Sequence, residues 1–141
     1  SIWHGNVHSA EVRKRRMPDV SGFLAQQKKV RQSVDAFLSE MEGRGLRTAV
    51  WGAGHQALAD LSLLDMAGRV EVVLDSADFK QNKLTPATHI PIASPSVLAA
   101  GEIGAVLVIA GSYSSEIMRI LELQYPQVVR AVLEHDGVRR G

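Results

Sequence analysis

The sequence predicts an α/β domain in which a doubly wound parallel sheet of four to five strands lies between two layers of helices. Short apolar runs alternate along the chain with amphipathic segments of helical period. The apolar runs, such as AVLVIA at 105–110, have no alternating polar positions, which is typical of strands buried on both faces. Such strands need helices on both sides and right-handed crossovers, so we expect three layers, α/β/α.

One long helix precedes this sheet. Apolar residues recur near i, i+3 and i+4 from about 19 to 42, and glycines at 43 and 45 follow. The same reasoning predicts strands at 48–51, 70–74, 105–110 and 128–133 and helices at 56–66, 95–100 and 114–124. An irregular stretch at 75–94 holds two prolines, and a polar tail follows residue 133. We divide the chain into an arm or linker at 1–18 and one domain at 19–141.

The composition is that of an ordinary globular domain. Of the 141 residues 45% are hydrophobic and 22% are charged, and the net charge of +1 favours neither nucleic acid nor a membrane surface. The chain has no cysteine, and its five histidines show no metal-ligand spacing. No apolar run reaches the roughly 20 residues of a membrane span. We expect a cytoplasmic protein without a metal, nucleic-acid or membrane partner.

The first predicted strand leads into a glycine turn, Gly52-Ala53-Gly54-His55-Gln56-Ala57, which fits the pattern G-x-G-x-x-G/A. In a Rossmann-like fold the first glycine permits a tight turn, the second lets backbone approach a phosphate, and the third small residue lets the helix pack on the sheet. The helix N-terminus then offers N–H groups to an anion, with His55 beside them. Asp75 ends the second predicted strand, where a ribose-binding carboxylate is expected.

This turn has more than one interpretation. Small residues after a first strand also serve packing alone. A full dinucleotide site needs two mononucleotide-binding halves, and a chain of 141 residues has room for little more than one. A methyl-donor site usually has a third glycine and an acidic residue in the first strand, and Val50-Trp51 offers neither. The turn therefore favours a phosphate-binding half-site over an NAD site.

The loop from Asp75 to Ile92 is long for a compact domain, and long loops are usually functional. Loops that follow parallel strands gather at the carboxyl edge of the sheet, where the glycine turn also lies. We expect the polar groups of the loop to converge with the helix N-terminus on one diphosphate-binding crevice. A solvated polar loop is the alternative. The groups concerned are Lys80, Gln81, Lys83, Thr85, Thr88 and His89.

The strand at 105–110 is followed by Gly111-Ser112-Tyr113-Ser114-Ser115. Gly111 permits a tight turn, and hydroxyls such as that of Ser112 are predicted to cap the next helix, whose N–H groups face the same crevice. Tyr113 is placed to stack on a base or a sugar, and a half-buried structural ring is the alternative. Nothing marks a base or a nucleophile elbow beside Ser112, so we predict no catalytic residue.

The segments WGAGHQAL and VLDSADFKQNKLTPATHIPI resemble the C-terminal domain of the sugar C-methyltransferase family. The resemblance runs from about Val34 to Tyr125, and its most specific part is the series from Lys80-Gln81 to Ile90-Pro91. A glycine commonly follows the Lys-Gln pair in that family, whereas this chain has Asn82. The segment HGNVHSAEVRK at 4–14 loosely resembles the HGGSLR segment that joins the central domain of the family to the C-terminal one.

The resemblance implies a parent enzyme of three parts. An N-terminal domain binds zinc through cysteines, and a central domain binds S-adenosylmethionine and carries the catalytic base. A Rossmann-like C-terminal domain closes over a nucleotide-linked keto-deoxysugar. The residues of this chain correspond to the third part alone, and they include no cysteine cluster and no methyl-donor fingerprint.

The sequence therefore predicts a domain that binds a nucleotide-diphosphate sugar and works with a methyl-donor-binding domain or subunit. No cofactor is expected to be bound by this chain itself. One alternative is a small NAD-binding oxidoreductase or redox-sensing domain, for which the glycine turn and Asp75 would hold the cofactor. The other is a structural or assembly domain that kept the fold and lost the ligand.

Overall fold

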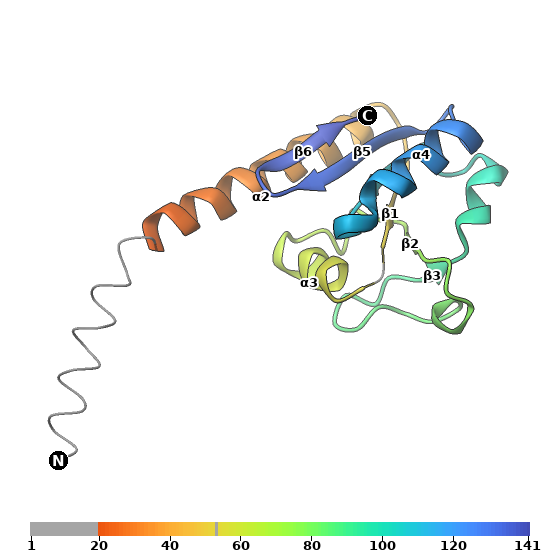
Figure 1. The fold of residues 1–141 in the computed structure, drawn as a ribbon, viewed down its shortest axis with the longest axis horizontal. Coiled ribbons are helices and arrows are strands. Elements are labelled where there is room, and N and C mark those ends of the chain that lie inside the picture. The colour runs from red at the N-terminus through yellow and green to blue at the C-terminus, as the bar shows by residue number, and fades with distance from the viewer. Residues whose placement is uncertain (1–19, 53) are drawn as a thin grey trace, which may run out of the picture.

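The computed structural model describes residues 20–52 and 54–141, and Figure 1 shows their fold. The predicted arm at 1–18 and Ala53 of the glycine turn lie outside the described residues. The elements follow the predicted alternation of helix and strand. Their order is α2 (Val20–Gly43), β1 (Thr48–Trp51), α3 (His55–Leu63), β2 (Val72–Leu74), η2 (Asp78–Lys80), β3 (Ile92–Ala93), η3 (Pro95–Ala100), β4 (Ala105–Val108), η4 (Gly111–Tyr113), α4 (Ser114–Gln124), β5 (Val129–Glu134) and β6 (Gly137–Arg140).

The described strands form one sheet of six in the order β3-β2-β1-β4-β5-β6. Every pair from β3 to β5 is parallel, and β6 is antiparallel to β5. From β1 the chain builds outward to β2 and β3 and then returns to β4 on the other side of β1. The carboxyl ends of β1 and β4 therefore flank a topological switch point, where open α/β sheets bind ligands. The predicted doubly wound α/β fold is confirmed.

Two of the six strands were not predicted. β3 has two residues and lies inside the stretch predicted as irregular, and β6 lies in the predicted polar tail. β6 follows β5 through the two-residue turn His135-Asp136, with Glu134 opposite Gly137, whose φ is 135°. An Asp-Gly pair after a strand is a known hairpin signal. The prediction of a polar tail was wrong because an edge strand with exposed arginines lacks an apolar pattern.

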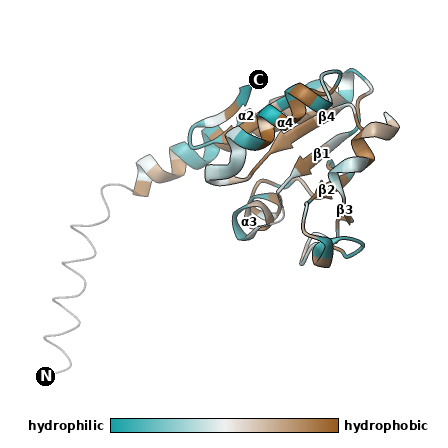
Figure 2. Ribbon diagram, turned by 45° about the vertical axis from the view of Figure 1, so that its right-hand side comes forward, coloured by the Kyte–Doolittle hydropathy of each residue, from teal (hydrophilic) through white to brown (hydrophobic). Residues whose placement is uncertain are grey.

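Helices cover both faces of the sheet, as the three-layer prediction requires. α2 and α3 pack on one face, where buried side chains such as Leu38 and Leu61 meet Val50 and Leu107. η3 and α4 pack on the other face, where Leu98 and Leu121 meet the opposite sides of the same strands. All residues of β1 and β4 are buried, and Figure 2 shows these central strands as hydrophobic. The switch point therefore lies at the rigid centre of the domain.

The long helix α2 packs on the sheet by its second half only. Its buried residues are Val34, Phe37, Leu38 and Met41, whereas its first turns extend beyond the sheet in Figure 1 and leave Phe23 61% exposed. β6 lies along α2, where the Ser33 hydroxyl accepts a hydrogen bond of 2.8 Å from the Val138 N–H. None of the helices in the described ranges combines the length and the apolar character that crossing a bilayer requires.

Candidate functional site

Gly52 follows β1 at the switch point and is required there by packing. Its φ is 135°, and a Cβ on it would lie 2.1 Å from the carbonyl oxygen of Ile109, just beyond β4. The Gly52 N–H also donates a hydrogen bond of 3.0 Å to the carbonyl of Leu74 at the end of β2. The first glycine of the turn thus lets the ends of three neighbouring strands approach one another.

Gly54, in contrast, is not required by the protein's own packing. Its φ of −75° is open to any residue, and no atom lies within 4 Å of the position that a Cβ would take. It is the N-cap of α3, and no side chain caps the N–H groups of this helix. His55, which is exposed, begins the helix. This N-terminus therefore presents its N–H groups to open space, as an anion site needs.

α4 begins at the carboxyl end of the neighbouring strand β4 and also lacks a side-chain cap. The predicted cap by Ser112 was wrong, because η4 continues directly into α4 and leaves Tyr113 at the N-cap position with helical dihedral angles. The hydroxyl of Ser114 accepts a hydrogen bond of 3.2 Å from the Ala110 N–H. The ring of Tyr113 is 69% exposed. The Ser114 N–H donates to the carbonyl of Gly111, so η4 and α4 form one continuous helix that begins at Gly111. The N-termini of this helix and of α3, both without a side-chain cap, thus flank the switch point.

Asp75 directly follows β2, but its carboxylate is already engaged. Oδ1 accepts a hydrogen bond of 2.8 Å from the Ala77 N–H, and Oδ2 lies 3.4 Å from Nζ of Lys80. Lys80 also lies over the ring of Phe79, 5.7 Å from its centroid. The Gln81 side chain donates a hydrogen bond of 2.9 Å to the Asp75 carbonyl. These residues lie near the glycine turn as predicted, but their polar groups hold one another.

The second half of the loop turns away from the switch point. The N–H of Asn82 donates to the carbonyl of Ile92, and the N–H of Ile92 donates to the carbonyl of Lys83. Asn82 has a φ of 63°, so an asparagine takes the left-handed conformation at the position where the family commonly has glycine. The chain then runs antiparallel along the outer side of β3. Lys83, which is exposed, is therefore more than two strands away from β1.

The tip of this hairpin carries the predicted hydroxyl groups and His89. Thr85 is 1% exposed, and its hydroxyl contacts that of Thr88 at 2.5 Å and accepts a hydrogen bond of 2.9 Å from the Ile90 N–H. Because the hairpin runs opposite to β3, its tip lies toward the amino-terminal end of that strand. The structure does not bring Thr85, Thr88 and His89 to the glycine turn. Their role in binding stays a prediction.

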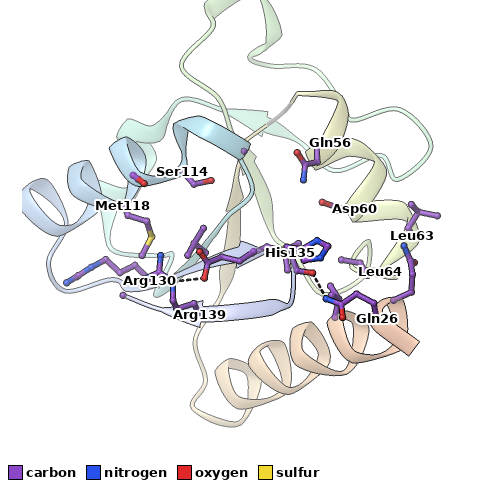
Figure 3. Close-up of a pocket in the computed structure, with 18 of the residues that line it drawn as sticks. Gln26, Gln56, Asp60, Leu63, Leu64, Ser114, Met118, Arg130, His135 and Arg139 are labelled. Carbon is purple, nitrogen blue, oxygen red and sulfur yellow. Dashed lines mark hydrogen bonds and ion pairs between the residues drawn. The ribbon is translucent and has the colours of Figure 1, made fainter. Parts of the chain in front are cut away.

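A pocket of about 1050 Å³ opens beside the switch point. α3 and α4 form opposite walls, and the start of α2 and the β5–β6 hairpin close the remaining sides. Figure 3 shows Gln56 and Asp60 directed from α3 into the hollow, with Ser114 across from them. Gly111 and Ser114 line the pocket and also belong to the turn at the start of α4. The crevice at the switch point and the pocket are therefore continuous.

Asp60 is the functional candidate that sequence reasoning missed, since it lies outside the glycine turn and the two predicted loops. It is half-buried, and burial raises the pKa of its carboxyl above the ordinary 3.8. Burial causes this shift, and no cation among the described residues offsets it. The available signal was its spacing: Asp60 lies one helical turn after Gln56 and one before Leu64, on one stripe of α3.

Among the other charges around the pocket, Arg139 is paired, whereas Arg130 is half-buried and forms no ion pair with the described residues. Nε of Arg139 lies 2.6 Å from Oε1 of Glu134 across the hairpin, and both side chains are largely exposed. The Gln26 side chain of α2 donates a hydrogen bond of 2.9 Å to the His135 carbonyl, which closes one end of the pocket. Within the described ranges no three acidic or histidine side chains are grouped as metal ligands. The pocket thus offers hydrogen-bond acceptors and apolar walls.

The fold is that of a Rossmann-like domain with its topological switch point between β1 and β4. The model of the C-methyltransferase C-terminal domain family matches residues 8–132. The chain therefore belongs to this family, as its resemblance suggested. The match extends beyond the 34–125 region of that resemblance at both ends, and β6 lies outside it.

Among solved structures, the chain is similar to a UDP-D-quinovosamine 4-dehydrogenase from Vibrio fischeri. The two are 16% identical, with a TM-score of 0.51 over 68% of this chain and 93% of that chain. At this identity the likeness supports the Rossmann-like fold alone. No curated protein matches the chain.

Proposed function

We propose that this chain binds a nucleotide-linked keto-deoxysugar by its diphosphate and positions the sugar for methyl transfer by a methyl-donor-binding domain outside the chain. The observation that carries this proposal is the pair of helix N-termini without side-chain caps, of α3 and of the continuous η4–α4 helix, at the switch point of a C-methyltransferase C-terminal domain. A diphosphate carries two neighbouring anionic groups, and each helix N-terminus offers N–H donors and a positive dipole end to one of them.

Each residue of this crevice has its own role in the proposal. Gly52 holds β1 against β4, and Gly54 leaves room for the diphosphate to reach the backbone. His55 adds a donor beside the first turn of α3. Lys80 is held near the switch point by its ion pair with Asp75, and its ammonium has further donors with which it contacts a phosphate. Tyr113, with its exposed ring, contacts the substrate beyond the phosphates.

The remaining loop residues contribute less directly. Gln81 holds the loop by its bond to the Asp75 carbonyl, and Thr85 shapes the hairpin by its buried hydroxyl bonds. Lys83 lies outside β3 and acts through the long-range field, which salt screens within about 10 Å at 0.1 M. The proposal therefore rests on the carboxyl-edge half of the loop.

The chemistry itself belongs to the other domain. S-adenosylmethionine bound there supplies the methyl group, and a base there removes the proton from the sugar carbon that accepts it. This chain contributes orientation, because binding energy from the non-reacting nucleotide is used to hold the reacting carbon in place. The parent protein is thus a methyltransferase, while this domain supplies no catalytic residue in the proposal.

NAD is the second candidate ligand, and a specific observation favours it. The strand order β3-β2-β1-β4-β5-β6 is that of dinucleotide-binding folds, with Asp75 at the end of β2. An adenosine ribose would need the Asp75 carboxylate, whose oxygens are held by the Ala77 N–H and by Lys80. A ribose would therefore have to share the Asp75 carboxylate with both partners, which makes NAD the weaker candidate.

Isothermal titration calorimetry tests the proposal. We titrate the chain with thymidine diphosphate and uridine diphosphate, beside NAD and S-adenosylmethionine. The variants are Lys80→Ala, Lys83→Ala and, as a matched control, Lys28→Ala on the exposed side of α2. A lost phosphate contact is worth about 1.4 kcal/mol, or tenfold in affinity.

We expect a nucleoside diphosphate to bind in preference to NAD and S-adenosylmethionine. Lys80→Ala should weaken this binding about tenfold, Lys83→Ala less than threefold, and Lys28→Ala not at all. Tight NAD binding that Asp75→Asn abolishes would replace the proposal by the oxidoreductase alternative. Absence of binding by every ligand at millimolar concentration would favour a structural domain.

A further inference from the structure

The pocket beside the switch point has a carboxylate that no residue of the described chain engages. Within that part of the chain the Asp60 side chain forms no ion pair or hydrogen bond, whereas both oxygens of Asp75 have partners. In Rossmann-like folds a carboxylate accepts the hydroxyl groups of a ribose, normally at the end of β2. In this domain the carboxylate at the end of β2, that of Asp75, already has two partners. The carboxylate of Asp60, which has none among the described residues, faces the pocket on the β4–β5 side.

A nucleotide sugar held at the switch point has two ends to place, and this step rests on the proposed function. The sugar end must stay accessible to a domain outside this chain. The nucleoside end takes no part in the reaction, so this end can be enclosed in a pocket, which strengthens binding of the ligand. The pocket of about 1050 Å³ starts at Gly111 and Ser114, where the diphosphate ends, and leads away from the open side of the crevice.

We propose that this pocket holds the nucleoside of the nucleotide sugar and that Asp60 accepts a hydrogen bond from a hydroxyl group of its ribose or deoxyribose. The nucleoside therefore extends toward β5, on the opposite side of the switch point from the β2 position of ordinary mononucleotide folds. Gln56, one turn before Asp60 on α3, supplies an amide at the entrance. The carboxylate determines specificity for a ligand that carries hydroxyl donors rather than a bare phosphate.

The walls of the pocket match the remaining part of a nucleoside. Leu63 and Leu64 at the end of α3 and Met118 on α4 face the hollow from opposite sides. Apolar surfaces of this kind suit contact with a planar base, and the thioether of Met118 makes favourable contacts with aromatic rings. Small-molecule pockets are typically about 300 to 1,000 Å³ and combine such apolar walls with a few polar groups. The pocket is therefore large enough for a nucleoside.

The test compares Asp60→Asn with Glu102→Gln. The second substitution removes one negative charge from an exposed side chain that precedes β4, at the amino-terminal ends of the strands and away from the switch point. Each variant and the unchanged chain are titrated with thymidine diphosphate and with inorganic pyrophosphate. We expect Asp60→Asn to weaken thymidine diphosphate about tenfold, because a bond to a charged acceptor is lost. Pyrophosphate, which has no ribose, should bind equally to all three proteins.

A second measurement maps the ligand on the unchanged chain by the amide shifts of its ¹⁵N NMR spectrum. Thymidine diphosphate should shift the amides of Asp60, Leu64 and Met118, and pyrophosphate should shift only those beside Gly54 and Ser114. Thymidine diphosphate that binds with shifts confined to residues 75–83 would overturn the inference and leave the proposed function intact. Equal weakening of both ligands by Asp60→Asn would also overturn it. Absence of binding by both ligands would overturn the inference and the proposed function together.

Discussion

The substitution Gly52→Ala tests whether the first glycine of the turn is required by packing. An alanine would have to adopt a φ of 135°, which costs about 1–3 kcal/mol for a residue with a Cβ. Its Cβ would also lie 2.1 Å from the carbonyl oxygen of Ile109, and relieving such an overlap in a packed core costs typically about 1–3 kcal/mol. We therefore expect a loss of about 3–5 kcal/mol, a large part of the roughly 5–15 kcal/mol that stabilises an ordinary domain.

Urea denaturation followed by circular dichroism measures this loss. With a slope of about 2 kcal/mol/M, the midpoint should fall by roughly 2 M. Gly54→Ala is the matched control, because its φ of −75° and its empty surroundings allow a Cβ. Its cost should stay below about 1 kcal/mol, the usual penalty for alanine at an N-cap. The same variant should weaken thymidine diphosphate binding, since its methyl group fills the space proposed for the phosphate. A loss below about 1 kcal/mol for Gly52→Ala would refute the packing argument.

Three further predictions concern stability and use thermal and urea unfolding. Arg69→Ala should lower the free energy of unfolding by about 1–2 kcal/mol at low salt and by less in 1 M NaCl, because the guanidinium lies 2.6 Å from Asp35 and is only 26% exposed. The same loss at both salt concentrations would show that Arg69 stabilises the fold by packing and not by charge. Gly137→Ala should cost about 1–3 kcal/mol, since its φ is 135° and a Cβ would lie 2.8 Å from the Ser33 hydroxyl; a neutral effect would mean that the hairpin can shift. Asp60→Asn should be more stable than the unchanged chain at pH 7, because burial raises the pKa of this carboxyl and its ionisation therefore destabilises the fold. That advantage should disappear below pH 3.8, where the carboxyl is protonated in both states, and an advantage independent of pH would contradict burial of the charge as its cause.

The central part of the fold could be predicted from sequence because its signal is local. AVLVIA at 105–110 became β4, and the amphipathic segment after the glycine turn became α3. The apolar pattern of each run predicts the type of element without any knowledge of distant segments, so period and composition suffice. The family was visible for a similar reason, since the motif from Lys80 to Pro91 is contiguous.

The remaining features depend on pairing between distant segments. The loop groups were expected to converge on one crevice, but the bonds between Lys83 and Ile92 turn the second half of the loop along β3. No local pattern specifies that pairing. Asp60 was missed because its burial arises from α2, α3 and α4 together, three helices that are far apart in sequence. The β6 strand was missed although Asp136-Gly137 signalled its turn, because its exposed face is charged.

Asp75 and Asp60 show why an acidic residue is better judged by its partners than by its place in a motif. Asp75 stands where a ribose-binding carboxylate is expected, yet its charge is neutralised within its own loop by Lys80. Asp60 stands outside any motif, and burial destabilises its ionised form without a compensating cation in the part of the chain that the structure describes. If Asp60 were purely structural, replacing it by asparagine would improve stability and change nothing else. If the variant is more stable at pH 7 and also binds a nucleoside diphosphate less tightly, the buried charge lowers the stability of the fold but strengthens ligand binding.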